Sequence, residues 1–111
     1  LTQGSICGWN YAAKQNMMGV ACDDDLKVKH ILLAENKLGG TIPPELSLLG
    51  SLRSLDLSQN SINGEIPTKL EQLTSLRELN LMSNKISGRI PSGLGSMSRL
   101  TSLDISSNFL S

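Results

Sequence analysis

Residues 52–75 read LRSLDLSQNSINGEIPTKLEQLTS, and residues 76–99 read LRELNLMSNKISGRIPSGLGSMSR. When they are aligned, the two segments carry apolar residues, an Asn, a Gly and an Ile-Pro pair in the same order. The period is 24 residues, and one asparagine of each period falls in the same place: Asn36, Asn60, Asn84 and Asn108. A fixed period of this length indicates a repeat architecture and decides the fold before local propensity does.

Each repeat contains a short stretch in which apolar and polar residues alternate, as in Leu55, Asp56 and Leu57. This alternation predicts a strand with one buried face. The Asn and Gly then turn the chain, and Pro begins a return leg whose three-residue leucine spacing predicts a short 3₁₀ turn. One coil cannot bury its apolar residues alone, so stacked coils must form the core. We expect repeats at residues 28–51, 52–75, 76–99 and, in part, 100–111.

The repeat pattern resembles the leucine-rich repeat, and specifically its plant-type 24-residue subclass. The diagnostic element is Gly-x-Ile-Pro after the Asn, present at residues 40–43, 64–67 and 88–91. The resemblance covers residues 28–111. It implies an α/β solenoid, a right-handed coil with a concave parallel sheet and short 3₁₀ or helical turns on the convex side. It also implies a recognition module similar to the ectodomains of receptor-like kinases and receptor-like proteins.

Residues 1–27 lie outside the repeats and resemble the N-terminal cap of plant-type repeat proteins. The likeness is carried by Cys7, Trp9, Gly19, Val20 and Cys22, although nine residues separate Trp9 from Gly19 where the family has one or two. The resemblance implies a Cys7–Cys22 disulfide, and hence an oxidising compartment. Two free thiols or half of a metal site are the alternatives, and a zinc site would need more ligands than the single histidine supplies.

Composition excludes several classes of protein. Ten basic residues balance ten acidic ones, and no basic stripe indicates nucleic acid as a partner. No apolar run approaches the roughly 18 residues that span a bilayer, so we expect no membrane insertion within this segment. The chain begins at Leu1 without a Met and stops at Ser111, where the Gly and Ile-Pro of a fourth repeat are due. We therefore expect a processed piece of a longer protein.

The asparagine column is expected to be structural. It lies where the chain leaves the strand, and an Asn side chain offers donors and an acceptor to backbone groups that neither the sheet nor water reaches. On this basis Asn60→Ala is expected to lower stability by about 2 kcal/mol.

Ligand contacts are expected on the concave sheet, at outward positions that differ between repeats. These are His30, Leu32, Ser54, Asp56, Glu78, Asn80, Met82, Ser102 and Asp104. Leu32 and Met82 are candidate apolar anchors, and Lys29, Arg53 and Arg77 form a neighbouring basic ladder. The alternative is that these positions are simply solvated. The face covers on the order of 300 Å², well below the roughly 800 Å² per partner of a standard interface.

Catalysis is not expected. His30, Ser54 and Glu78 share one column, but a triad needs His between the nucleophile and the acid, and here Ser54 is in the middle. The sequence indicates no cofactor and no metal. Ice binding needs a regular array of small polar residues, whereas the column Thr41, Glu65 and Arg89 is charged and irregular.

The leading hypothesis is an extracellular or cell-surface module that recognises a protein or peptide ligand and engages a co-receptor, within a membrane-anchored protein that could also carry a kinase domain. The alternatives are a secreted inhibitor of a foreign enzyme, similar to polygalacturonase inhibitors of this repeat class, and a structural or adhesive wall protein. The full-length sequence beyond Ser111 would discriminate between these three hypotheses.

Overall fold

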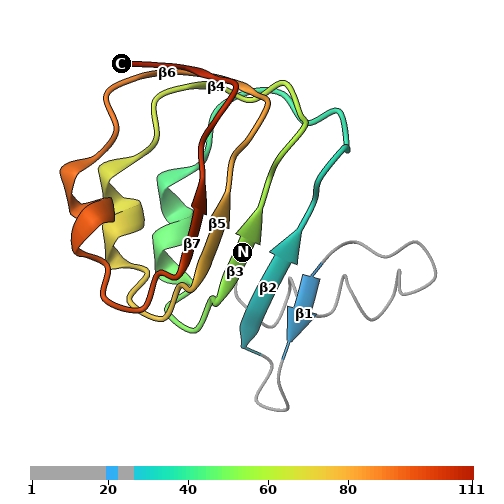
Figure 1. The fold of residues 1–111 in the computed structure, drawn as a ribbon. Coiled ribbons are helices and arrows are strands. Elements are labelled where there is room, and N and C mark those ends of the chain that lie inside the picture. The colour runs from blue at the N-terminus through green and yellow to red at the C-terminus, as the bar shows by residue number, and fades with distance from the viewer. Residues whose placement is uncertain (1–19, 23–26) are drawn as a thin grey trace.

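The main sheet is built from one strand of each coil. The computed structural model describes residues 20–22 and 27–111. The strands of this sheet, in spatial order, are β1 (Val20–Cys22), β2 (Val28–Leu32), β3 (Ser54–Asp56), β5 (Glu78–Asn80) and β7 (Ser102–Asp104) (Figure 1). The last four pair in parallel, whereas β1 runs antiparallel to β2. The strands expected from the alternating segments and the parallel sheet implied by the resemblance are therefore confirmed.

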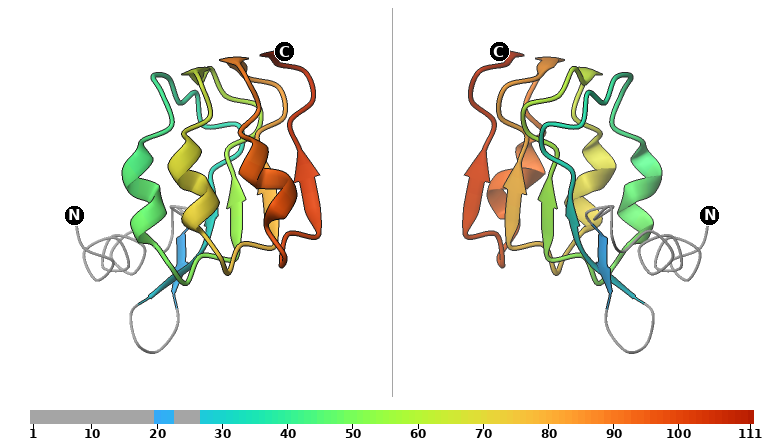
Figure 2. Two further views of the ribbon diagram at one scale, coloured as in Figure 1. Left: turned by 90° about the vertical axis from the view of Figure 1, so that its left-hand side faces the viewer. Right: turned by 90° about the vertical axis from the view of Figure 1, so that its right-hand side faces the viewer.

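Three 3₁₀ helices form the opposite side of the coils, as Figure 2 shows from two directions. They are η1 (Pro44–Leu48), η2 (Thr68–Gln72) and η3 (Ser92–Ser96). Each follows a proline in extended conformation, namely Pro43, Pro67 or Pro91. Proline fixes φ and lacks an N–H, so it suits the residue before a helical turn. The return leg expected from the leucine spacing is confirmed.

The core is aliphatic and lies between the sheet and the 3₁₀ helices. Fully buried leucines come from the strands and from the return legs, including Leu55, Leu79, Leu70 and Leu73. They occupy the periodic apolar positions of the sequence, because these are the positions that every coil turns toward its neighbours. Burial is most complete in the middle coils and decreases at the last one, where Leu103 is 43% exposed.

A second, shorter parallel sheet follows the asparagine turns and was not anticipated from the sequence. It consists of β4 (Asn63–Gly64), β6 (Lys85–Gly88) and β8 (Phe109–Leu110). Thr41 extends it by an isolated bridge to Asn63. At Gly88, φ is +82°, a backbone conformation that favours glycine, and an added Cβ would lie 2.6 Å from the Cγ of Glu65, whose side chain would have to shift.

The residue before each repeat asparagine adopts a left-handed conformation. These residues are Glu35, Gln59, Ser83 and Ser107, with φ between 54° and 57°. None is glycine, although the left-handed region costs other residues roughly 1–2 kcal/mol. The asparagine that follows compensates by fixing the turn through its hydrogen bonds. The strain recurs at this position in every coil, and Lys37, with φ of 56°, adds a second left-handed residue in the first coil.

The asparagine ladder joins neighbouring coils. The Oδ1 atom of Asn84 accepts from the N–H of Ile62 at 3.0 Å, and its Nδ2 donates to Leu57 O at 2.9 Å in the preceding coil and to Leu81 O at 3.1 Å in its own. Asn60 and Asn108 make the corresponding bonds one coil earlier and one coil later. Asn36 is exposed, and its side chain donates only to Ala34 O. Three of the four asparagines therefore make the hydrogen bonds between coils that the expected structural role requires.

Candidate functional site

The candidate contacts on the concave sheet fall into two rows that the strand register holds across the coils. The first row, which we call the histidine row, consists of residues paired from one strand to the next: His30, Ser54, Glu78 and Ser102. The second row, which we call the aspartate row, is paired in the same way and consists of Leu32, Asp56, Asn80 and Asp104. Met82 lies beyond the strands, two residues after Asn80, and is half-buried. The register thus brings eight of the nine expected contacts into two lines.

The exposure of these side chains differs from the expectation at one position. Ser54 is only 7% exposed, because it is a short side chain between His30 and Glu78 on the neighbouring strands. It is therefore covered, and the expected accessibility of this residue is corrected. Ser58, which shares an outward column with Met82, is likewise buried. Leu32 is 53% exposed and presents an apolar side chain at the start of the aspartate row.

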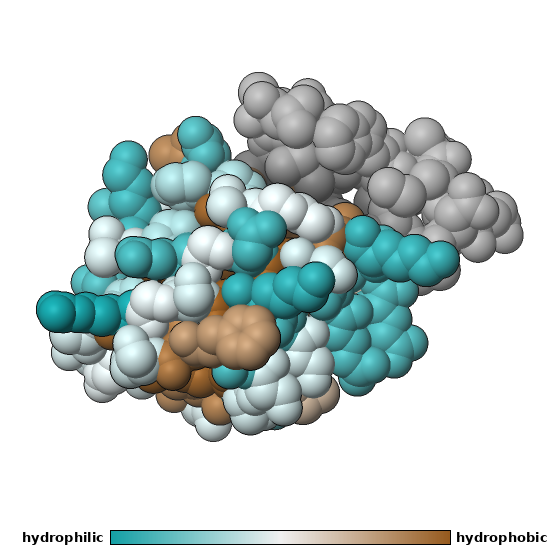
Figure 3. Space-filling model, turned by 90° about the horizontal axis from the view of Figure 1, so that it is seen from above, coloured by the Kyte–Doolittle hydropathy of each residue, from teal (hydrophilic) through white to brown (hydrophobic). Residues whose placement is uncertain are grey.

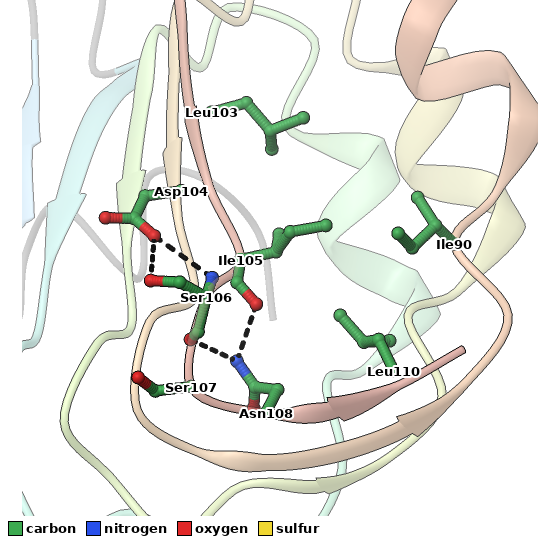
Figure 4. Close-up of a pocket in the computed structure, with 8 residues that line it drawn as sticks. All are labelled: Ile90, Leu103, Asp104, Ile105, Ser106, Ser107, Asn108 and Leu110. Atoms are coloured by element: carbon green, nitrogen blue, oxygen red, sulfur yellow. Dashed lines mark hydrogen bonds between the residues drawn. The ribbon is translucent and has the colours of Figure 1, made fainter.

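The three polar members of the aspartate row are fixed in the same way. The Oδ1 atom of Asp56 accepts from the N–H of Ser58 at 2.9 Å and from its Oγ at 2.6 Å. Asp104 accepts from the N–H of Ser106 at 3.0 Å and from its Oγ at 2.6 Å (Figure 4). In Asn80 the Oδ1 atom accepts from the N–H of Met82 at 3.0 Å. Each side chain is therefore held at the end of its strand by the residue two positions later.

This arrangement leaves one polar atom of each side chain available to a ligand. Within residues 27–111 no further side-chain partner binds Oδ2 of Asp56, Nδ2 of Asn80 or Oδ2 of Asp104. The row consequently offers an acceptor, a donor and an acceptor on successive rungs about 4.8 Å apart. Because the side chains are already ordered, binding to them costs little additional conformational entropy.

Ser106 also tunes the charge at the end of the row. Its hydroxyl and then its backbone N–H hold the pKa of the Asp104 carboxyl below the ordinary value of 3.8, against the small opposing effect of desolvation. The depressed pKa means that these bonds stabilise the fold above about pH 4 and that this contribution is lost as the pH falls through the folded-state pKa.

Ser106→Ala removes the largest of these causes and is expected to raise the pKa of Asp104 toward 3.8. The measurement is an NMR titration of the Asp104 carboxyl carbon. Ser107→Ala is the control, since Ser107 donates no bond to Asp104 within the described residues. An unchanged Asp104 pKa in Ser106→Ala would show that the bond to the hydroxyl is absent in solution.

A third line of residues is basic and lies at the start of the strands, inside β2 for Lys29 and directly before β3 and β5 for the two arginines. The N–H of Arg53 donates to Lys29 O at 2.7 Å, the N–H of Arg77 donates to Arg53 O at 2.8 Å, and the N–H of Thr101 donates to Arg77 O at 2.8 Å. We call Lys29, Arg53 and Arg77 the basic row. The ladder expected from the sequence is thus aligned by backbone hydrogen bonds, and both arginines are exposed.

The described residues offer no catalytic or metal-binding constellation of their own. Ser54 lies between His30 and Glu78, so the register preserves the unsuitable order of a triad. No group of three His, Cys, Asp or Glu side chains within residues 27–111 is arranged to hold a metal ion. Among the described residues, no helix has both the length and the apolar character to cross a bilayer. The expected Cys7–Cys22 disulfide and most of the cap lie outside the described side chains.

The end of the solenoid beyond β7 has an open apolar surface. A hollow of about 430 Å³ lies there, lined by Ile90, Leu103, Asp104, Ile105, Ser106, Ser107, Asn108 and Leu110 (Figure 4). Phe109 is 70% exposed on the neighbouring β8. Seen from above, apolar surface emerges between polar groups in several places, including the middle of this face (Figure 3). The hollow adjoins the concave face, since Asp104 of the aspartate row is among the residues that line it.

The stacked coils, with residues that differ from coil to coil on the concave sheet, define a recognition scaffold. Family models agree: one for the Leucine Rich Repeat matches residues 27–49, and one for Leucine Rich repeats (2 copies) matches residues 50–90. The chain belongs to the leucine-rich repeat family. No curated protein gives a significant match.

Solved structures narrow the likeness to receptor ectodomains. The ectodomain of the receptor kinase SOBIR1 from Arabidopsis thaliana is 35% identical with a TM-score of 0.79, covering 83% of this chain and 56% of that one. A second similar structure is the ectodomain of the Arabidopsis thaliana membrane receptor kinase GASSHO1/SCHENGEN3 in complex with CASPARIAN STRIP INTEGRITY FACTOR 2. It is 39% identical with a TM-score of 0.79, and the match covers 93% of this chain and 13% of that one.

The Arabidopsis receptor kinase HAESA, solved with the peptide hormone IDA and the co-receptor SERK1, is also similar. It is 47% identical with a TM-score of 0.67, and the match covers 69% of this chain and 13% of that one. The chain therefore spans little more than half of the SOBIR1 ectodomain and a much smaller share of the other two. The resemblance to receptor-like ectodomains stated from the repeat motif is confirmed.

Proposed function

We propose that this chain is a non-catalytic part of an extracellular, receptor-like ectodomain and that it binds an extended peptide segment across its concave sheet. The observation that carries the proposal is the aspartate row, in which three ordered polar side chains follow the exposed Leu32 in strand register. A row of hydrogen-bonding groups with an apolar anchor suits a peptide, whose backbone supplies donors and acceptors and whose side chains supply apolar contact.

The complexes of two similar receptors bear on the ligand class, and one of them contains a peptide hormone. GASSHO1/SCHENGEN3 was solved with a factor bound, and HAESA with a peptide hormone and a co-receptor. By this analogy the ligand is a peptide, a co-receptor is a second partner, and the site lies outside the cell. The concave face measures on the order of 300 Å², so this segment supplies one part of a longer contact surface rather than all of it.

The division of the chain belongs to the same proposal. Residues 1–27 form a cap with a Cys7–Cys22 disulfide, and residues 28–111 carry the repeats. The antiparallel pairing of β1 with β2 supports this division, because every later strand of the main sheet pairs in parallel. A strand of opposite direction at the end of the sheet does not continue the repeat, as expected of a capping segment.

The test uses Asp56→Asn combined with Asp104→Asn, since the amide retains Oδ1 as the acceptor for the serine and removes only the charge. Peptides selected from a random display library on the wild-type chain are measured by fluorescence polarisation. We expect the double variant to bind basic selected peptides about fivefold more weakly, the scale of two exposed charge pairs. Glu45→Gln is the control, because Glu45 is exposed on η1 at the convex side.

Equal affinity of the wild type, the double variant and the control would show that the aspartate row does not contact the peptides. A library that yields no binding peptide at all would contradict peptide recognition by this segment. If the double variant binds as well as wild type and Leu32→Ser abolishes binding, the contact lies at the apolar start of the row. The polar side chains of the row would then have no role in binding.

A further inference from the structure

The last strand of the main sheet is an open edge. Among the described strands β7 pairs with β5 alone and lies at one end of the strand order, whereas β1 lies at the other end (Figure 1). In the earlier coils, the N–H groups of Leu57 and Leu81 donate to carbonyls of the following coil at 2.9 and 2.8 Å. Ile105 is the equivalent residue after β7, and within residues 27–111 its N–H has no acceptor. Unpaired backbone groups of this kind can pair with a strand of another chain.

This edge lacks two features that commonly protect an edge strand, namely several charged residues and proline. Residues 100–111 contain one charged residue, Asp104, and no proline. Leu103 in β7 is 43% exposed and lines the hollow of about 430 Å³ (Figure 4). A partner at this edge therefore has to supply both a strand and an apolar surface.

The opposite edge of the sheet shows which orientation a partner strand can take. β1 runs antiparallel to β2 and occupies the edge on which a coil of a second molecule would otherwise stack. Head-to-tail stacking of copies would therefore require β1 to leave the sheet. The same pairing shows that an end strand of this sheet accepts an antiparallel neighbour. A second copy offers such a neighbour in its own β7, through a two-fold axis that places the same surface on both sides of the contact.

A two-fold axis at Leu103 satisfies the backbone of the edge without opposing two carboxylates. N–H groups two residues apart point to the same neighbouring strand, so Leu103 directs its N–H to the open side as Ile105 does. In this register Leu103 pairs with Leu103 of the second copy, and the Ile105 N–H meets the carbonyl of Thr101. Asp104 then lies opposite Ser102. Like charges directly opposite each other destabilise a sheet, and this register avoids them.

The area of the coil end sets the strength of such a contact. A coil of 24 residues at about 3.3 Å per residue has a perimeter of about 80 Å and encloses at most about 500 Å². Two such faces bury no more than about 1,000 Å² in total, below the roughly 1,200–2,000 Å² of stable complexes. We therefore expect a dissociation constant on the order of 100 µM, so that the chain is a monomer at low micromolar concentration.

We propose that this edge binds a second copy of the chain, β7 to β7 and antiparallel, and that the two main sheets become one continuous sheet in a weak dimer. An axis perpendicular to the sheet leaves both concave faces on the same side and covers Leu103 and the hollow of each copy. This inference does not depend on the proposed function, since it uses backbone groups at the edge and the apolar side of the last coil.

The first test is sedimentation velocity of the wild-type chain between about 5 and about 500 µM, a range that spans the expected dissociation constant. The mass should rise from 11.9 kDa toward twice this value. Hydrogen exchange over the same range should show that the Ile105 amide gains protection with concentration. A chain that remains a monomer at about 500 µM would overturn the inference.

The second test probes the register through Ser102, which is exposed and lies opposite Asp104 of the second copy. Ser102→Lys places opposite charges together in both symmetric contacts, and Ser102→Glu places like charges together. We expect the first to tighten and the second to weaken the dimer, each about fivefold. The same two substitutions at Ser61, which is exposed in the second coil, are the matched control and should stay within about twofold.

The outcomes distinguish the second copy from other partners of this edge. If Ser102→Lys and Ser102→Glu change the dissociation constant equally, or no more than the Ser61 variants do, the antiparallel pairing of β7 with β7 is wrong. If the chain stays a monomer and instead binds a synthetic peptide of residues 76–99, the edge takes another coil and a second copy is not its partner.

Discussion

Asn84→Ala is expected to lower the free energy of unfolding by about 3 kcal/mol, more than the roughly 2 kcal/mol expected for Asn60→Ala. Asn84 is 7% exposed and accepts from Ile62 N–H while donating to carbonyls of two coils. Alanine leaves these buried backbone groups without their partner, and each such group costs about 1–3 kcal/mol. A thermal melt should show a Tm lower by roughly 12 °C.

Asn36→Ala provides the internal control for this series. Asn36 occupies the same position in the repeat, but it is exposed and its side chain makes a single local bond to Ala34 O. We expect a loss of under about 0.5 kcal/mol, as for other exposed positions. Hydrogen exchange adds a residue-specific measurement, because the Ile62 amide should lose protection in Asn84→Ala. Equal melts for Asn36→Ala and Asn84→Ala would contradict the ladder as the link between coils.

The asparagine ladder illustrates what the sequence can predict. Its period fixed the position of each coil, and the place of Asn after the strand indicated which backbone groups needed partners. The strands, the 3₁₀ helices and the buried leucine columns were predictable by the same reasoning, since each is marked by side chains that recur every 24 residues. The receptor-like class was predictable from the Gly-x-Ile-Pro element, a local pattern with high specificity.

Features made by the backbone or by neighbouring coils were not predictable in this way. The second sheet at β4, β6 and β8 is formed by short backbone pairs whose side chains show no strand pattern. The left-handed turns at Gln59 and its equivalents use residues other than glycine. Sequence reasoning would need to recognise that the asparagine after each turn can hold this conformation in place.

The candidate site was predictable as two rows but not in its details. Periodicity placed His30, Ser54 and Glu78 on one line, but the burial of Ser54 depends on the relative size of its neighbours across the sheet. Similarly, Asp56 was expected to be a free ligand contact, whereas one oxygen is already bound by Ser58. The recurrence of Asp-x-Ser at residues 56–58 and 104–106 was the available signal for this interaction.

Leu79→Ala is expected to have the largest effect on stability, a loss of about 4 kcal/mol within the range of about 2–5 kcal/mol for buried Leu→Ala changes. Leu79 is 1% exposed on the central strand β5, and its column has Leu55 on one side and Leu103 on the other. The substitution removes buried methyl groups and leaves a cavity that the two flanking coils keep from collapsing. Chemical denaturation should show a lower midpoint with little change in slope.

Leu103→Ala is the matched comparison, because it removes the same atoms from the same column one coil later. Leu103 is 43% exposed, so less apolar surface returns to water and no closed cavity forms. We expect a loss of about 1 kcal/mol. The stability of a solenoid comes from contacts between neighbouring coils. The difference between the two losses therefore reports that Leu79 packs against a coil on each side, whereas Leu103 packs against a coil on one side. Equal losses for the two variants would mean that Leu103 is covered in solution, and a concentration-dependent midpoint for wild type would then identify a second molecule as the cover.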